Sequence, residues 1–135
     1  MTTDAAFSFE SYKFDKVLID FQNIGLNNLD VKFEPTGIFH KEESNFELQI
    51  KFIATTQESL LFVEIIAIAN FAFENVNVLE EIPSFFYRNA IAIFFPYLRA
   101  YVSLVTNQAG HSAFILPTLN LSKLEEPLRA NTIIK

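Results

Sequence analysis

The fold is decided by the stretch FELQIKF at residues 46–52, in which every second residue is apolar. Strict alternation predicts a β-strand with one face on a core and the other in water. The pattern recurs upstream in residues 7–21, with one change of phase, and in residues 29–33, before Pro35 and Gly37 interrupt it. We therefore expect three half-buried strands in the first 52 residues.

Downstream, the run LLFVEIIAIANFAF at residues 60–73 departs from simple alternation. Its odd positions are all apolar, whereas its even positions mix large apolar side chains such as Phe62 with Glu64 and Asn70. This run predicts a fourth strand with one fully buried face. The opposite face, with an apolar group beside a charge, suits either a binding surface or burial under a loop.

After Pro83 the apolar period changes from two to that of a helix. Residues 85–95 contain neither Gly nor Pro, and residues 97–105 continue an apolar stripe. Pro96 is expected to end or kink this helix because it lacks an N–H. A weaker helix is expected at residues 121–134, interrupted by Pro127.

Strands followed by helices predict an α+β fold. We expect one domain over residues 1–135: a four-stranded antiparallel sheet, followed by a long broken helix and a shorter C-terminal helix.

Composition restricts the class of partner. The 135 residues include 16 Phe, and 50% are hydrophobic. This aromatic excess favours an oligomer or a surface for apolar partners over a tightly packed monomer, since aromatic side chains dominate interface energetics. A net charge of −6 argues against nucleic-acid binding, which needs clustered Lys and Arg. The chain has no cysteine, which excludes disulfides and thiolate metal sites.

The sequence predicts neither an export signal nor membrane insertion. Residues 1–9 carry Asp4 and no basic residue, unlike a signal peptide, so a cytoplasmic location is expected. Residues 89–98 are uncharged but lie between Arg88 and Arg99 and contain Pro96. A spanning helix needs about 20 apolar residues. This segment is therefore expected to be a helix buried by protein.

Signatures of enzymes are nearly absent. His40 and His111 are far apart in the sequence and lack the spacing of metal ligands. His111 and Ser112 could form half of a nucleophilic site, but an exposed turn is the favoured interpretation. Three Gly are too few for a phosphate-binding loop, and Arg99 is expected to be structural. We expect no catalytic residue, metal or cofactor.

Four motifs resemble those of the SecB family of protein-export chaperones. NAIAIFFPYLR at residues 89–99 resembles a SecB helix that carries Phe-Pro-Tyr-Ala-Arg, and FILPTLNL at residues 114–121 is similar to its Phe-Pro-Gln-Leu-Asn-Leu loop. LFVEI at residues 61–65 resembles Phe-Leu-Cys-Glu-Val, and Tyr12 with Asp15 resembles a Tyr-x-x-Asp. The positions that match the family's structural motifs are Phe95, Pro96, Tyr97, Arg99, Pro117, Leu119, Asn120 and Leu121.

The resemblance implies an ATP-independent holdase that binds unfolded preproteins and keeps them competent for export by the Sec pathway. It also implies that both helices pack on one face of the four-stranded sheet, and that the chain forms a homo-tetramer, built as a dimer of dimers with the long helices between two sheets. Candidates for the groove that binds client polypeptides are Ile38, Phe39, Leu61, Phe62, Leu119 and Leu121. The even face of the fourth strand is expected to point outward, and the positions matching contacts with the motor protein SecA are Asp15, Phe62 and Glu64.

The sequence departs from the family pattern in three places. Ala100 stands where the family has Glu, so an ion pair to Arg99 is expected to be missing. Ala69 and Asn70 replace a Gly-Gly pair, and residues 133–135 do not form the polar, acidic tail that docks on SecA. Two alternatives therefore stay open. One is a chaperone dedicated to an antitoxin of a toxin–antitoxin system. The other is a lipid or small-ligand binder with a closed apolar cavity between sheet and last helix.

Overall fold

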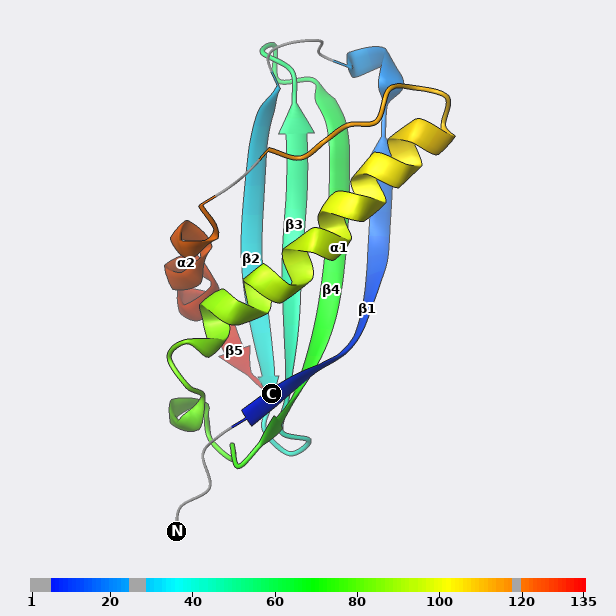
Figure 1. Ribbon diagram of the computed structural model, residues 1–135. Coiled ribbons are helices and arrows are strands. Elements are labelled where there is room, and N and C mark those ends of the chain that lie inside the picture. The colour runs from blue at the N-terminus through cyan, green and yellow to red at the C-terminus, as the bar shows by residue number, and fades with distance from the viewer. Residues whose placement is uncertain (1–5, 25–28, 118–119) are drawn as a thin grey trace.

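A single mixed sheet carries one long helix across one face (Figure 1). The computed structural model describes residues 6–24, 29–117 and 120–135. The elements follow in the order β1 (Ala6–Ile19), η1 (Phe21–Asn23), β2 (Asp30–His40), β3 (Asn45–Thr55), β4 (Leu61–Glu74), η2 (Leu79–Glu81), α1 (Phe86–Gln108), η3 (Leu121–Leu124), α2 (Glu125–Ala130) and β5 (Thr132–Ile134). The strand order is β1-β4-β3-β2-β5. The α+β class is confirmed, but the sheet has five strands, because β5 adds in parallel to the edge of β2.

The single helix expected at residues 121–134 is wrong in its last part, where the chain forms a strand. Helix α2 ends at Ala130, and the next residues pair with β2. Thr132, Ile133 and Ile134 are all β-branched, and this residue type favours strands. Pro127 does not interrupt α2, because it lies in the first turn, where a missing N–H costs nothing.

The expected interruption of the strand at Pro35 and Gly37 is also wrong, since β2 continues through both residues. The N–H of Gly37 points away from β3 and donates to the carbonyl of Asn131 at 3.1 Å. Because alternate residues of a strand share one orientation, the missing N–H of Pro35 also falls on the side away from β3. The ladder with β3 therefore stays intact across the proline.

Strand β1 changes phase twice rather than once. Two bulges, at Glu10 and Asp15, interrupt its register with β4. Each bulge adds one residue and so exchanges the two faces of the strand. As a result Phe9, Tyr12 and Phe14 all lie on the helix side, where Phe14 stacks on Tyr101 of α1 with ring centroids 4.0 Å apart.

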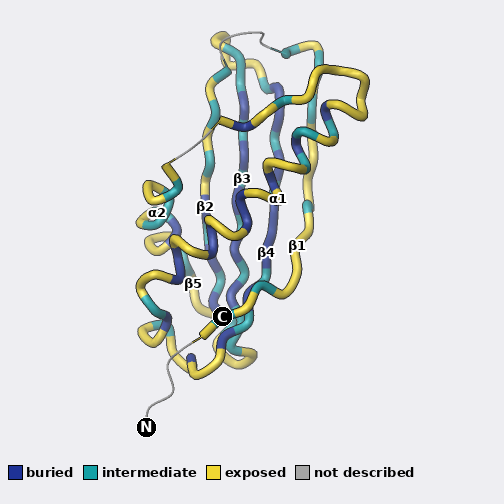
Figure 2. Tube along the Cα trace, in the orientation of Figure 1, coloured by how far each residue is buried: buried dark blue, intermediate teal, exposed yellow. Residues whose placement is uncertain are grey.

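Helix α1 is unbroken, contrary to the expectation at Pro96. The proline lies on the exposed face of the helix, and the carbonyl that its N–H would have met belongs to Ala92, which is also exposed. Water can solvate that carbonyl, so the break is not required. The 23-residue helix is long and apolar enough to cross a membrane by length and composition. Its inner face is nevertheless buried on the sheet, as in the core helix of a globular domain (Figure 2).

The core lies between α1 and the sheet, whose central strands β3 and β4 are the most deeply buried (Figure 2). Much of the aromatic excess is used here rather than on a surface. Phenylalanine side chains that are fully buried in the domain are Phe39, Phe46, Phe52, Phe62, Phe71, Phe86 and Phe94. Phe86 of α1 packs edge-on against rings from β1, β3 and β4, which fixes one end of the helix on the sheet.

Candidate functional site

After α1 the chain turns back and crosses over the sheet to reach α2 (Figure 1). The turn is made at Gly110, whose φ of 89° is open to glycine without strain. We call residues 111–117 the crossover segment. It is anchored by Thr106, a buried polar residue whose hydroxyl accepts from the N–H of Phe114 at 2.8 Å and donates to the carbonyl of Val102 at 2.8 Å. The hydroxyl of Ser103 donates to the carbonyl of Phe114 at 3.2 Å.

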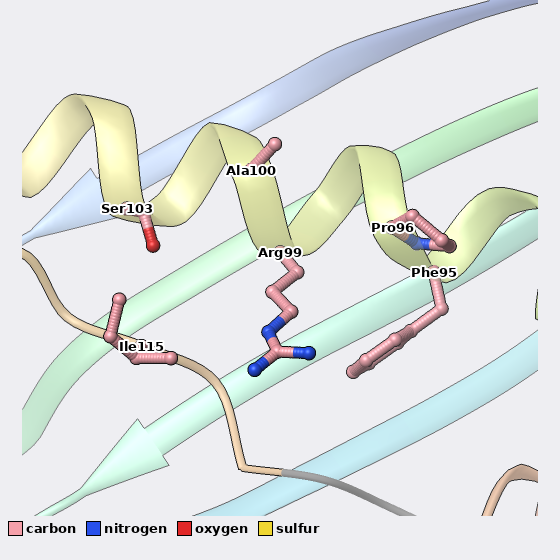
Figure 3. A pocket seen from close by; sticks show the side chains of 6 residues that line it. All are labelled: Phe95, Pro96, Arg99, Ala100, Ser103 and Ile115. Atoms are coloured by element: carbon pink, nitrogen blue, oxygen red, sulfur yellow. The ribbon is translucent and has the colours of Figure 1, made fainter.

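A cavity of about 370 Å³ opens between α1 and the crossover segment. Its lining residues are Phe95, Pro96, Arg99, Ala100, Ser103 and Ile115, shown in Figure 3. Phe95 also contacts Phe33 of β2, with ring centroids 5.7 Å apart, so aromatic rings continue from the cavity down to the sheet. Ile115 is 58% exposed and forms the opposite wall. We call this space the crossover cavity.

Among the described lining residues Arg99 is the charged one, and its guanidinium extends from α1 toward the crossover segment (Figure 3). The residue is exposed, and within the described ranges it makes no ion pair. Ala100, at the next position, has no carboxylate to offer it. A guanidinium has five N–H donors and no acceptor. In an apolar cavity it can bind backbone carbonyls or a carboxylate of an incoming chain.

The expected groove residues do not come together in one place. Phe39 pairs with Phe46, at one end of the sheet, whereas Phe62 lies near the opposite end of β4. At about 3.3 Å per residue, the two ends are about 30 Å apart. Ile38 and Leu61 are half-buried at these two ends, and Leu121 is half-buried at the start of η3. Leu119 lies outside the described residues.

The side chain of Phe62 does not point outward with that of Glu64, so the expectation for this face of the fourth strand is wrong at Phe62. A bulge between Leu61 and Val63 in the pairing with β3 turns it to the helix side. There Phe62 is fully buried, with its ring edge-on to Phe114 at 5.5 Å and to Phe21 at 6.1 Å. Its role is to support the crossover segment from below.

The sheet face opposite α1 carries the other residues expected to contact a motor protein. Asp15 is exposed at a bulge of β1, and its carboxylate lies 3.5 Å from the ammonium of Lys13. Glu64 forms an ion pair with Lys16 of β1, and this hydrogen-bonded ammonium holds the pKa of the Glu64 carboxyl below its usual value. The part of this face around Asp15, Lys16 and Glu64 is therefore charged.

The family-motif positions have different local roles. Asn120 caps η3 by accepting the N–H of Ser122 at 3.3 Å, and Pro117 is exposed in the crossover segment. Tyr97 contacts Phe9 and Tyr12 of β1, with ring centroids 5.2 and 4.7 Å away. Its neighbours on the outward face of α1 form an apolar strip that we define as Ala92, Ile93, Pro96, Tyr97, Ala100 and Leu104. In this strip Leu104 is 56% exposed and Ile93 is 37% exposed.

The described residues contain no group of three or more His, Cys, Asp or Glu side chains that could hold a metal ion. The described lining of the crossover cavity offers apolar contact, ring stacking and hydrogen bonding from the Arg99 guanidinium and the Ser103 hydroxyl. Such a lining can bind chain segments.

Comparison with known sequences agrees with this description. Residues 5–127 match the family described as preprotein translocase subunit SecB. The chain belongs to the SecB family. Membership of this family supports a chaperone role. No curated protein sequence matches the chain closely enough to add to this assignment.

Two solved structures are similar to this SecB-family chain. One is the SecB-like chaperone Rv1957 of Mycobacterium tuberculosis, in complex with a ChAD peptide from the antitoxin HigA1. It is 18% identical, with a TM-score of 0.66 over 84% of this chain and 90% of that chain. The other is a protein of unknown function from Streptococcus agalactiae, 12% identical, with a TM-score of 0.43 over 86% of this chain and all of that one. The first match shows the shared fold.

Sequence reasoning named Phe95, Pro96 and Arg99 only as structural positions of a family motif, and it missed three further residues that shape the crossover cavity. Thr106 and Ser103 anchor the crossover segment, and Ile115 forms a wall. A Thr in the last turn of an apolar helix was a usable signal, since a buried hydroxyl needs partners. No pattern pointed to Ile115, because its position depends on the path of the crossover segment.

Proposed function

We propose that this SecB-family protein is an ATP-independent holdase that binds unfolded preproteins in the cytoplasm and keeps them competent for export. The observation that carries the proposal is the open apolar crossover cavity, continuous with the apolar strip on α1. A chaperone without a fixed client sequence needs apolar area and tolerant shape, which aromatic and aliphatic side chains supply. The lone guanidinium of Arg99 adds hydrogen bonds that any backbone can accept.

The proposal includes a homo-tetramer, formed as a dimer of dimers through the apolar strip of α1. Large exposed side chains in this strip, among them Ile93 and Leu104, are the kind that protein partners cover. Delivery to SecA is a further part of the proposal. Asp15 and Glu64 on the charged sheet face would make that contact, while the buried ring of Phe62 would act only indirectly.

The test is aggregation of a chemically unfolded model protein diluted into buffer without nucleotide, followed by light scattering. Suppression at near-stoichiometric amounts is expected. Ile115→Asp removes apolar area from the wall of the crossover cavity and places a carboxylate in the same lining as the guanidinium of Arg99. It should weaken suppression several-fold, because an apolar client segment loses its contact with Ile115 and a carboxylate paired with Arg99 competes for the donors that would bind the client backbone. Ala113→Asp adds the same charge to an exposed position of the same segment and should act like the wild type. Equal activity of the two variants would exclude this cavity as the binding site.

A second candidate function is a chaperone dedicated to an antitoxin. The specific observation in its favour is that the Mycobacterium tuberculosis relative binds an antitoxin peptide. A dedicated chaperone should bind one peptide far more tightly than unrelated unfolded chains. Comparing aggregation suppression across several unrelated unfolded proteins separates the two functions, since a general holdase protects all of them. A closed lipid cavity between the sheet and the last helix is not proposed, because the crossover cavity is open and lies between α1 and the crossover segment.

A further inference from the structure

The outer edge of β2 is occupied by a short strand from the same chain. Residues 132–134 of β5 pair in parallel with Gly37, Ile38 and Phe39. Three backbone bonds flank the pairing: Gly37 N–H to Asn131 O at 3.1 Å, Lys135 N–H to Phe39 O at 2.9 Å, and Lys41 N–H to Lys135 O at 3.1 Å. The edge is thus shown to accept an extended, parallel chain segment (Figure 1).

Strand β5 is held more weakly than any other strand of the sheet. It forms three residue pairs, whereas β2 and β3 pair along the whole of Asp30–His40. Ile133 and Ile134 remain 53% and 50% exposed, so little apolar area is buried by the pairing. Parallel pairing is also slightly less stable per residue than antiparallel pairing.

The helix before β5 is anchored independently of it. Leu128 is fully buried, and the guanidinium of Arg129 lies 4.8 Å from the ring centroid of Tyr87 and donates to the carbonyl of Ser84 at 3.0 Å. Asn131 ends the helix, with its side chain donating to the carbonyl of Pro127 at 2.8 Å. The Thr132 hydroxyl donates to the carbonyl of Leu128 at 2.7 Å and so ties the first residue of β5 to the helix. The other contacts do not involve residues 133–135, so these residues can leave the edge while α2 stays in place.

The edge is shaped for an apolar strand. A Cβ on Gly37 would overlap the Phe46 ring and meet the Thr132 hydroxyl at 2.7 Å, so glycine is what lets a side chain of the added strand approach Phe46. Ile38 and Ile133 are register partners and share the outer face, whereas Phe39 and Ile134 share the helix face. A segment with neighbouring apolar residues therefore offers one side chain to each face.

We propose that β5 is a built-in occupant of a strand-addition site, and that an extended apolar segment of an unfolded client displaces β5 and pairs with β2. The client would then use the backbone groups of Gly37, Phe39 and Lys41 that β5 now uses. Backbone pairing is independent of client sequence, and competition with β5 selects extended, apolar segments. This inference rests on the proposed holdase function and adds a second binding element to the crossover cavity.

The test locks β5 in place. The natural chain has no cysteine, so Ile38→Cys with Ile133→Cys gives one cross-strand pair on the outer face. Neighbouring strands bring register partners within the range of a disulfide. The probe is reduced, carboxymethylated α-lactalbumin, which stays unfolded without denaturant and has no free thiol. The oxidised variant should bind it about tenfold more weakly than the same variant after reduction.

A second measurement follows the edge itself by amide hydrogen exchange in the wild-type protein. On adding the probe, the Lys135 N–H should lose protection while the Gly37 and Lys41 N–H groups keep theirs, because the client replaces β5 as their partner. Equal binding by oxidised and reduced variants, with Lys135 still protected, would overturn the inference and leave the holdase function standing. Failure of the wild-type protein to bind the probe or to suppress aggregation would overturn the proposed function itself.

Discussion

The hydroxyl of Thr106, in the last turn of α1, accepts the backbone N–H of Phe114 at 2.8 Å, across the turn that reverses the chain. The same hydroxyl donates to the carbonyl of Val102 at 2.8 Å, so both of its hydrogen-bonding capacities are used inside the domain. Thr106 is 1% exposed. One side chain thus fixes the crossover segment on the helix and sets the position of Ile115 at the cavity wall.

Replacing Thr106 with Val should destabilise the fold by about 1–3 kcal/mol, because the N–H of Phe114 loses its partner in a part-buried site. Thr106→Ser keeps the hydroxyl and should lose less, which makes it the matched control. Urea unfolding followed by circular dichroism measures both. If Thr106→Val is as stable as Thr106→Ser, the hydrogen bond does not hold the crossover segment.

The apolar strip on α1 should carry the subunit contact. Leu104→Asp puts a charge at its most exposed large side chain, and the assembly constant should fall by at least about tenfold because burial of a Leu is worth about 1.5–3 kcal/mol. Asn107→Asp adds the same charge near the end of the same helix, outside the strip, and should leave assembly unchanged. Sedimentation velocity at several protein concentrations measures the mass of the assembly and hence the assembly constant. A Leu104→Asp protein that still assembles would place the contact elsewhere.

The sequence was sufficient for the four long strands and for the position of α1, because one-sided burial leaves a period in the chain, but it did not reveal β5. The alternation of apolar residues predicted the wrong face of the sheet for side chains next to a β-bulge. The bulge at Glu10 turns Tyr12 and Phe14 to the helix side, although the alternation alone places them on the other face, and the bulge at Asp15 then restores the original phase. The bulge beside Phe62 likewise turns its ring inward.

Two further differences between the expected and the observed elements depend on tertiary context rather than on the local sequence pattern. Pro35 and Pro96 lie in the interiors of β2 and α1, where sequence rules predict a break. Each is tolerated because the group left without a bond faces an edge or solvent. The candidate site was predictable only in part: Phe95 and Arg99 carry a motif, whereas Ile115 reaches the cavity through the path of the crossover segment.

The ion pair between Lys16 and Glu64 gives the charged sheet face a defined pH dependence. The hydrogen-bonded ammonium holds the pKa of Glu64 below the 4.5 of a free side chain. The pair therefore contributes stability above pH 4.5, and this contribution is lost as the pH falls through the lowered pKa. Lys16→Met should raise the pKa of Glu64, measured by carbon NMR of its carboxyl group. Lys13→Met, which removes the neighbouring ammonium near Asp15, is the control and should leave it unchanged.

Gly37 links the core to the edge of the sheet, so its substitution should act on both. In Gly37→Ala the new methyl group overlaps the Phe46 ring and crowds the Thr132 hydroxyl, and overpacking of this kind costs about 1–3 kcal/mol. We expect lower stability in urea together with faster hydrogen exchange at the Lys135 N–H, which reports on β5.

A double-mutant cycle separates the Gly37 clash from a general effect of the methyl group. Phe46→Leu shortens the side chain that the methyl meets, so Gly37→Ala should cost less in the Phe46→Leu background than in the wild type. Gly110→Asn is the control, because no atom lies within 4 Å of its Cβ position and Asn tolerates a positive φ. It should leave Lys135 exchange unchanged. An additive cycle would show that the cost of Gly37→Ala does not arise from Phe46, because residues that share a contact couple and independent sites do not.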